Sequence, residues 1–165
     1  MGAVWVFLDV DGVLNDDRTE DRTPNGFAGL DEDKVALLAD FVHEVGAKVV
    51  LTSTWKDRDL WARDLNPGAD LTYLLCQLSE HDVEVEAYAR DGDRGSAVRE
   101  WLDGHSGNAV IFDDHWKNSF RAAGVARFLV QTTIKKGLQP KHIRQAKRLL
   151  EQQRRTMVYT HKSIS

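Results

Sequence analysis

The chain has 165 residues, a length that suffices for one domain with a substantial core and excludes a large second domain. Its composition, 42% hydrophobic and 29% charged residues with a net charge of −4, excludes a disordered or fibrous chain and fits an ordinary globular protein. The single cysteine, Cys76, excludes an intrachain disulfide and favours a reducing compartment. The N-terminal apolar run meets Asp9 too early for a signal peptide, so we expect a cytoplasmic protein.

The first predicted element is a buried strand that ends in two acidic residues. Residues 3–8 form an unbroken apolar run with two valines and two aromatic residues, which is typical of a strand buried on both faces. Asp9 and Asp11 follow, and Gly12 allows the backbone to turn sharply after them. Buried carboxylates are costly unless they are paired or bind a metal, so this ending indicates a functional site. An ordinary Asp-Gly turn is the alternative.

A polar loop, a helix and a second strand are predicted next. The loop over Asp16–Gly29 is long enough to be functional rather than a mere connection. Asp31 is the expected N-cap of a helix whose apolar residues recur at helical spacing as far as Gly46. The run Lys48–Thr52 predicts a second buried strand, which ends in a cluster of hydroxyl side chains: Thr52, Ser53 and Thr54.

The middle of the chain predicts two helices and an edge strand. Residues 58–65 are consistent with a short helix, and a second helix is expected after an N-cap at Asp70, with Cys76 as filler in the core. Strict alternation of apolar and polar residues over Val83–Tyr88 predicts a strand with one wet face, as found at a sheet edge.

The rest of the chain continues to alternate between helices and strands. Helices are expected over Ser96–Leu102, through Phe120, and from Pro140 onward, with strands over Ala109–Phe112 and Arg127–Val130. This alternation predicts a Rossmann-like α/β fold: a mostly parallel five-stranded sheet with helices on both faces. We expect one domain over residues 1–155 and a C-terminal tail over residues 156–165.

Chemically useful side chains follow three of these strands where each strand ends. The first strand is followed by Asp9 and Asp11, the second by Thr52 and Ser53, and the fourth by Asp113 and Asp114. Because the carboxyl ends of parallel strands meet at one edge of the sheet, we expect these groups to lie together at that edge, where open α/β sheets bind ligands.

In this order and placement, the segments resemble the four motifs of the haloacid dehalogenase (HAD) superfamily. The matching segments are Asp9-Val10-Asp11-Gly12-Val13, the strand ending in Thr52-Ser53, a later basic residue that opens a helix, and Asp113-Asp114. The resemblance spans nearly the whole chain and implies a phosphatase with Mg²⁺ as its cofactor. The intervals where larger relatives carry a cap domain are short here, so no folded cap is expected.

The resemblance also implies roles for the acidic residues. Asp9 would be the nucleophile that forms an aspartyl-phosphate, and Asp11 the general acid and base. Mg²⁺ takes oxygen ligands, and they would come from Asp9, the main-chain carbonyl of Asp11, and Asp113 or Asp114. Which residue of the last pair is the direct ligand stays open.

The phosphate itself requires hydrogen-bond donors and a cation. The hydroxyl groups of Thr52 and Ser53 would donate to its oxygens, and Arg94 stands where several branches of the superfamily carry lysine at a helix start. An arginine would bind phosphate with a planar fork instead of a point charge, and an exposed loop residue is the alternative. Lys56 either contacts the substrate or is a surface lysine. Trp55 and Trp116 flank the motifs and either line the site or pack in the core.

The basic residues suggest the kind of substrate. From Thr132 onward the chain has nine basic residues and one acidic residue, a net charge of +8, so the preceding part carries −12. A basic C-terminal helix fits contacts to the backbone phosphates of RNA or DNA ends, and a merely solvated helix face is the alternative. The motifs are most similar to small uncapped HAD domains of RNA repair proteins and to the phosphatase half of polynucleotide kinase-phosphatases. We therefore expect a terminal phosphate of a polynucleotide or nucleotide as the substrate.

Two other functions compete with this interpretation. One is a phosphomonoesterase for small molecules such as nucleoside monophosphates. The other is a receiver-like or catalytically silent phosphate-binding module, since receiver domains also combine acidic pairs, threonine and lysine on an α/β sheet. A receiver carries its phospho-acceptor after a middle strand, whereas the Asp-x-Asp-Gly motif here follows the first strand.

Overall fold

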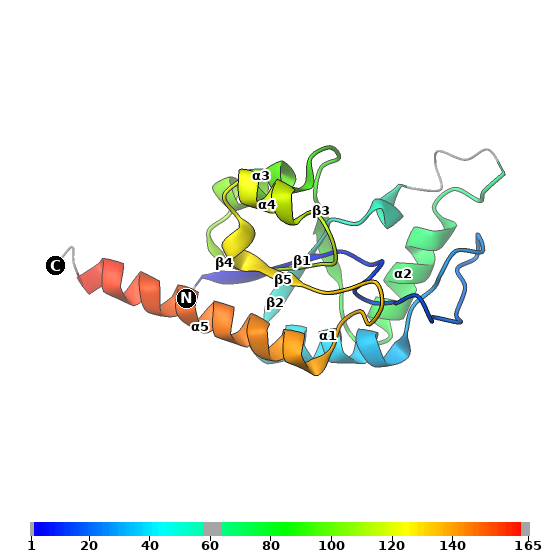
Figure 1. The fold of residues 1–165 in the computed structure, drawn as a ribbon, viewed down its shortest axis with the longest axis horizontal. Helices are drawn as coiled ribbons and strands as arrows, with labels where there is room; N and C mark the ends of the chain where they lie inside the picture. The colour runs from blue at the N-terminus through cyan, green and yellow to red at the C-terminus, as the bar shows by residue number, and fades with distance from the viewer. Residues whose placement is uncertain (1, 58–63, 163–165) are drawn as a thin grey trace.

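Five parallel strands form a single sheet that lies between two layers of helices (Figure 1). The computed structural model describes residues 2–57 and 64–162, the last five of them as backbone alone. The strand order is β3-β2-β1-β4-β5. The strands are β1 (Ala3–Leu8), β2 (Ala47–Leu51), β3 (Val85–Tyr88), β4 (Gly107–Asp113) and β5 (Leu129–Gln131). The α/β class, the parallel sheet and the edge position of β3 confirm the predictions.

Strand β1 is the centre of this sheet because it pairs with β2 on one side and β4 on the other. Phe7 lies beside Val50 of β2 and Ile111 of β4, so the three strands end at nearly the same level. The chain proceeds outward from β1 in both directions, which makes the gap between β1 and β4 the topological switch point of the sheet. In open α/β sheets, this point at the carboxyl edge is where ligands bind.

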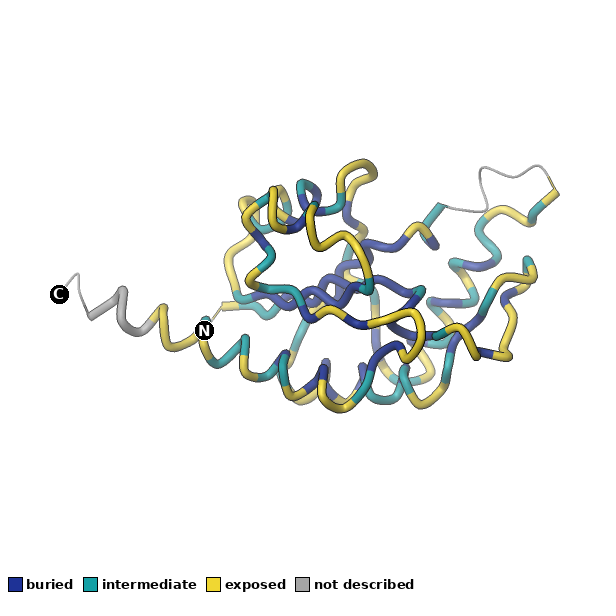
Figure 2. The backbone as a smooth tube through the Cα atoms, viewed as in Figure 1, coloured by how far each residue is buried: buried dark blue, intermediate teal, exposed yellow. Residues whose placement is uncertain are grey.

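The two faces of the sheet are covered by different helices. Val6 and Leu8 of β1 pack in a core with α1 (Glu32–Val45), α2 (Ala69–Ser79) and the start of α5 (Pro140–Lys162). Trp5 and Phe7 point to the opposite face, which α3 (Arg94–Gly104) and α4 (Lys117–Ala122) cover. Two short 3₁₀ helices, η1 (Thr54–Lys56) and η3 (Ala126–Phe128), complete the described elements. Figure 2 shows the centre of the sheet as largely buried, and most residues of β1, β2 and β4 are buried. Burial on both faces explains the unbroken apolar run of β1.

Helix α2 corrects two predictions. Its N-cap is Gly68 rather than Asp70, which lies inside the first turn, fully buried, and accepts a hydrogen bond from the backbone N–H of Asn25. Cys76 is exposed rather than buried. Leu74 and Leu78 are the buried residues of this stretch, and Cys76, two positions from each, falls on the opposite side of the helix. The short helix predicted over residues 58–65 lies mostly outside the described residues.

The segment Asp16–Gly29 forms no separate domain and lies beside α2 (Figure 1). A single antiparallel bridge joins Arg22 to Ala28, and Asn25 forms hydrogen bonds with the backbone of Asn66. Within the described residues the two candidate cap positions thus hold only this loop and α2, and no large cap covers the carboxyl edge of the sheet.

Helix α5 is longer than the other helices in the described part of the chain. It begins below the carboxyl edge, runs back under the sheet and projects beyond the N-terminus (Figure 1). It continues without a break past residue 155, the predicted end of the domain, and into the segment expected as a tail over residues 156–165. None of the helices described is long and apolar enough to cross a lipid bilayer.

Candidate active site

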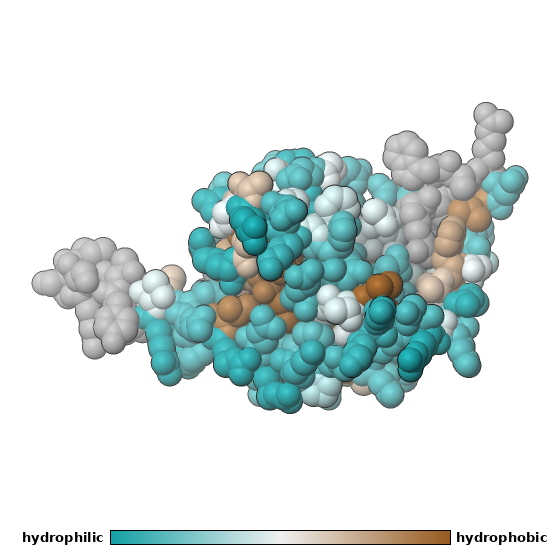
Figure 3. Space-filling model, viewed as in Figure 1, coloured by the Kyte–Doolittle hydropathy of each residue, from teal (hydrophilic) through white to brown (hydrophobic). Residues whose placement is uncertain are grey.

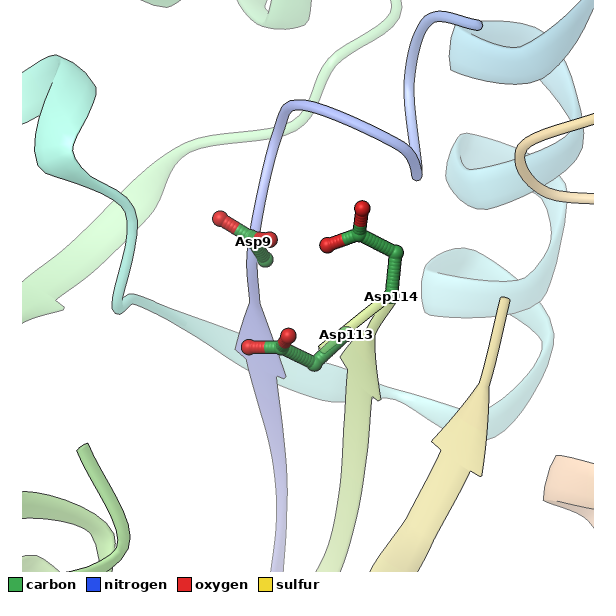
Figure 4. A group of neighbouring side chains, drawn as sticks. All are labelled: Asp9, Asp113 and Asp114. Atoms are coloured by element: carbon green, nitrogen blue, oxygen red, sulfur yellow. The ribbon is translucent and has the colours of Figure 1, made fainter. Parts of the chain in front are cut away.

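Three carboxylates meet at the switch point between β1 and β4 (Figure 4). Asp9 directly follows β1, Asp113 ends β4, and Asp114 comes next. One carboxylate oxygen of each lies within 4.8 Å of those of the other two. Asp113 is completely buried and Asp9 is only 6% exposed. We call these three residues the acid cluster. The parallel pairing of β1 with β4 is what brings together residues more than a hundred positions apart.

Arg94 supplies positive charge to this cluster. It is the first residue of α3, and its Nη1 lies 2.7 Å from Oδ2 of Asp113 and 3.2 Å from Oδ1 of Asp9. Asp93 is the N-cap of the helix and accepts a hydrogen bond from the backbone N–H of Ser96, which holds this first turn in place. Arg94 is therefore part of the site, and the alternative of an exposed loop residue is wrong.

Burial and neighbouring charges shift the pKa values of Asp9, Asp113 and Arg94. Burial raises the pKa of Asp9 well above its ordinary value and the nearby charge of Asp113 raises it further, whereas Arg94 lowers it. Burial likewise raises the pKa of Asp113, against the opposing effect of Arg94. Burial acts to lower the pKa of Arg94, but the two carboxylates outweigh it and raise that pKa. The cluster therefore has more negative groups than its one guanidinium neutralises, a condition that a bound cation would relieve.

Asp11 lies just beyond the cluster and is held by two side chains. Its Oδ1 accepts hydrogen bonds from Nδ2 of Asn15 and Nε1 of Trp55, both at 3.0 Å. Oδ1 of Asn15 in turn accepts from the backbone N–H of Gly12, which has a φ of 77°. A Cβ at Gly12 would lie 2.3 Å from Oδ2 of Asp114, so only glycine fits this turn. The Asp9-x-Asp-Gly segment thus forms a tight turn that packs directly against the acid cluster.

Asn15 and Trp55 both contact Asp11, and sequence reasoning had predicted neither contact. Asn15 is 1% exposed and joins the motif turn to the loop above it through a hydrogen bond to the carbonyl of Gly29. Its position four residues after Asp11 was the sequence signal that could have indicated a contact with Asp11. Trp55 is fully buried, and nothing in the sequence indicated that its N–H reaches Asp11, because that pairing depends on the adjacency of β1 and β2.

The two predicted phosphate-binding hydroxyls differ in their surroundings. Thr52 follows β2 and lines the pocket beside the acid cluster, and its Oγ1 is buried without a hydrogen-bond partner among the described residues. A buried hydroxyl without a partner is costly, so this atom is suited to a ligand oxygen. Ser53 is the N-cap of η1, where its Oγ accepts from the backbone N–H of Trp55, and it does not line the pocket.

The pocket beside Arg94 has a volume of about 450 Å³ and opens to solvent. Its walls come from the loop after β2, the loop after β3, α3 and the turn before α4. The lining residues are Thr52, Thr54, Lys56, Asp57, Ala89, Arg90, Asp91, Gly92, Arg94, Ala97 and Trp116. Lys56 reaches this pocket, where its Nζ lies 2.6 Å from Oδ1 of Asp91. Trp116 also faces it, whereas Trp55 is in the core.

The acid cluster fits a magnesium ion. Mg²⁺ takes oxygen ligands at about 2.0–2.1 Å in an octahedral arrangement, commonly one or two carboxylates with water and substrate phosphate. Asp9, Asp113 and Asp114 offer such oxygens within 4.8 Å of one another, and the pocket lined by Arg94 and Thr52 lies beside them. Asp113 is already engaged by Arg94 and by the backbone N–H of His115, whereas Asp114 is half-buried against Gly12.

A comparison with protein families agrees with this geometry. The family described as "HAD domain in Swiss Army Knife RNA repair proteins" matches residues 5–143, which include every predicted site residue. Neither a curated protein nor a solved structure matches the chain. The match covers most of the chain, and HAD domains generally use Mg²⁺ and suggest phosphohydrolase activity. The chain therefore belongs to the family of HAD domains found in Swiss Army Knife RNA repair proteins.

Proposed function

We propose that the protein is a Mg²⁺-dependent phosphatase that removes a terminal phosphate from a polynucleotide or nucleotide through an aspartyl-phosphate intermediate. The observation that carries the proposal is the acid cluster itself: a buried Asp9 beside Asp113 and Asp114, with the Arg94 guanidinium 3.2 Å from the attacking carboxylate. When bound, Mg²⁺ supplies positive charge that favours ionised carboxylates and neutralises phosphate oxygens. Its ligands would be Asp9, the main-chain carbonyl of Asp11, and Asp113 or Asp114.

The reaction uses two displacements at phosphorus. The Asp9 carboxylate forms a new O–P bond, the ester P–O bond breaks, and the protonated Asp11 carboxyl gives its proton to the leaving oxygen. Water then attacks the phosphorus of the aspartyl-phosphate while Asp11 takes a proton from that water. The bond between phosphorus and the Asp9 oxygen breaks, which restores the Asp9 carboxylate and releases inorganic phosphate. Arg94 and the Thr52 hydroxyl bind the equatorial phosphate oxygens in both steps, and Ser53 is a weaker candidate because its oxygen caps η1.

The position of Asp11 supports this division of labour. Two residues after Asp9, its carboxylate is held through one oxygen by Asn15 and Trp55 and lies outside the acid cluster. An acid that must exchange protons with leaving group and water needs a fixed position more than it needs a metal contact.

Unpaired basic residues near the start of α5 support a polynucleotide substrate. Five exposed cations follow β5 and have no ion-pair partner among the described residues: Lys135, Lys136, Lys141, Arg144 and Arg148. Three other cations on the helix are paired, Lys147 with Glu44 and both Arg154 and Arg155 with Glu151. Figure 3 shows a largely hydrophilic surface over α5. The unpaired group follows the strand that ends at the same edge as the acid cluster, which is where a nucleic-acid strand would approach.

The decisive experiment measures phosphate release from RNA and DNA oligonucleotides phosphorylated at the 3′ or the 5′ end, and from mononucleotides, with and without Mg²⁺. We expect release only with Mg²⁺ and only from a protein with Asp9 intact, and faster release from one class of oligonucleotide than from mononucleotides. Asp9→Asn should abolish it, while Asp40→Asn, an exposed carboxylate on α1, should not. Metal-independent release, or an active Asp9→Asn, would reject the mechanism, and a preference for mononucleotides would favour the small-molecule alternative.

A further inference from the structure

Trp116 is an exposed aromatic side chain at the mouth of the proposed phosphate site. It is 46% exposed, and among the exposed large hydrophobic residues described it alone lines the pocket beside Arg94. The other four are Phe27, Tyr88, Ile134 and Met157. A tryptophan normally buries most of its large surface, so its exposure here leaves a flat apolar face available to a ligand.

The backbone of Trp116 has an unusual conformation. Its φ is 60°, and among the described residues other than glycine only Asp82 shares a positive φ. Aspartate tolerates this region well, whereas a bulky residue there is strained at a cost on the order of 1 kcal/mol. The conformation is imposed from both sides: Oδ1 of Asp113 accepts from the N–H of His115, and the carbonyl of Trp116 accepts from the N–H of Phe120. The turn that follows the acid cluster therefore fixes where the indole lies.

In this position the Trp116 indole contacts Arg94, which in turn contacts Asp9, the proposed nucleophile. The guanidinium carbon of Arg94 lies 5.4 Å from the centre of the Trp116 ring, and the same guanidinium contacts Asp9. A phosphate ester bound by Arg94 thus carries its leaving group within reach of Trp116. The pocket between them, at about 450 Å³, lies in the range of roughly 300–1,000 Å³ that small-molecule sites occupy.

We propose that this pocket binds the nucleoside that carries the scissile phosphate, with its base stacked on Trp116. The inference rests on the proposed phosphatase function and specifies its substrate: an unpaired nucleotide whose base is accessible. Every base has a flat π face, and stacking on an aromatic side chain is sequence-tolerant. Lys56, Asp57 and Arg90, which also line the pocket, offer donors and an acceptor for the edges of a base and for the sugar.

The test compares two oligonucleotides that differ in one base. Both carry the phosphate at the end that the protein hydrolyses, and in one the terminal nucleoside is replaced by an abasic sugar. We expect kcat/KM to favour the base-bearing substrate by about tenfold or more, since stacking of one base contributes on that scale. Trp116→Ala should reduce this ratio to near one, Trp116→Phe should retain most of it, and Tyr88→Ala, an equally exposed aromatic residue outside the pocket, should preserve it.

A structural role for Trp116 would lower turnover of both substrates alike and leave the ratio unchanged, which would overturn the inference. Binding provides a second readout: the base-bearing oligonucleotide should bind Asp9→Asn at least tenfold more tightly than the Asp9→Asn, Trp116→Ala double variant, and the abasic one should not distinguish them. If no phosphate substrate is hydrolysed, the proposed function fails, yet this binding comparison still tests Trp116. A phosphotyrosine peptide that binds more tightly than either oligonucleotide would overturn the assignment of a nucleoside.

Discussion

The acid cluster and helix α5 are both rich in charge, but they hold that charge in opposite ways. In the cluster, Asp9 and Asp113 are nearly or completely buried, and the largely buried Arg94 side chain lies within ion-pair distance of both. On α5 the cations stand in solvent, and the pairs that exist, such as Arg155 with Glu151, join exposed side chains.

Burial determines how strongly each charge interacts with the groups around it. Inside the protein a charge interacts strongly with its neighbours and shifts their pKa values, so removing one member leaves the others uncompensated. An exposed pair contributes about 0–1 kcal/mol and is screened by salt, so exposed charges act on a partner through their number rather than through single contacts. We therefore propose that the cluster acts on a substrate at one point and that α5 acts by attraction over a surface. The following changes test this contrast.

The largest effect is expected from Asp9→Asn. Loss of the nucleophile should lower kcat by about 10³-fold or more, because no remaining group replaces a covalent step. The same change removes a buried charge whose pKa burial has raised, so the metal-free variant should be more stable at pH 7 than the metal-free parent. Urea denaturation in a chelator measures this, and a less stable variant would contradict the idea that the cluster carries excess negative charge.

Arg94→Gln should destabilise the protein strongly when no metal is present. It leaves Asp9 and Asp113 buried without their cation, a change that typically costs about 3–5 kcal/mol. Addition of Mg²⁺ should recover part of this loss, and denaturation curves with and without the ion measure it. Arg99→Gln is the matched control, since Arg99 is half-exposed and pairs with Asp103 on the same helix, and its effect should stay within about 0.5 kcal/mol. Equal effects would mean that Arg94 is not part of a buried cluster.

Neutralising the first half of α5 should weaken binding of a single-stranded oligonucleotide in a salt-dependent manner. For Arg144→Gln with Arg148→Gln, the slope of log affinity against log salt should become shallower by about 1.4, at roughly 0.7 for each phosphate contact. Arg154→Gln with Arg155→Gln removes the same charge, but both side chains already pair with Glu151, so a smaller change is expected. Titrations at several salt concentrations distinguish the two pairs, and identical slopes would remove the special role of the unpaired residues.

The smallest effect concerns His142, which lies in the first turn of α5. Its Nδ1 accepts a hydrogen bond from the backbone N–H of Gln139 at the start of α5, and burial together with Lys141 lowers its pKa below the ordinary 6.5. As the pH falls below 6.5, the imidazole of His142 is therefore protonated in the unfolded chain before it is protonated in the folded chain. The free energy of unfolding should fall as the pH is lowered, by at most about 1.4 kcal/mol per pH unit. His142→Gln should flatten this decrease between pH 7 and 5, and an unchanged slope would exclude His142 as its source.

The sequence alone predicted the five strands and the acidic residues that follow two of them. The apolar run before Asp9 and its counterpart before Asp113 predicted two buried strands, and both are neighbours at the centre of the sheet. The basic residue predicted to open a helix near these acids, Arg94, lies within ion-pair distance of Asp9 and Asp113. These predictions succeeded because burial on both faces of a parallel strand leaves a local pattern, and because the carboxyl ends of such strands share one edge.

Side-chain partners were decided only by tertiary structure. The bond from Trp55 to Asp11, the capping role of Ser53 and the exposure of Cys76 all depend on how the elements are oriented and which neighbours they receive. Trp116 faces the pocket because hydrogen bonds around the end of β4 impose a left-handed turn on it. Local composition reports how deeply a segment is buried, whereas the contacts of one side chain depend on segments far away in the sequence, and only the folded chain brings those together.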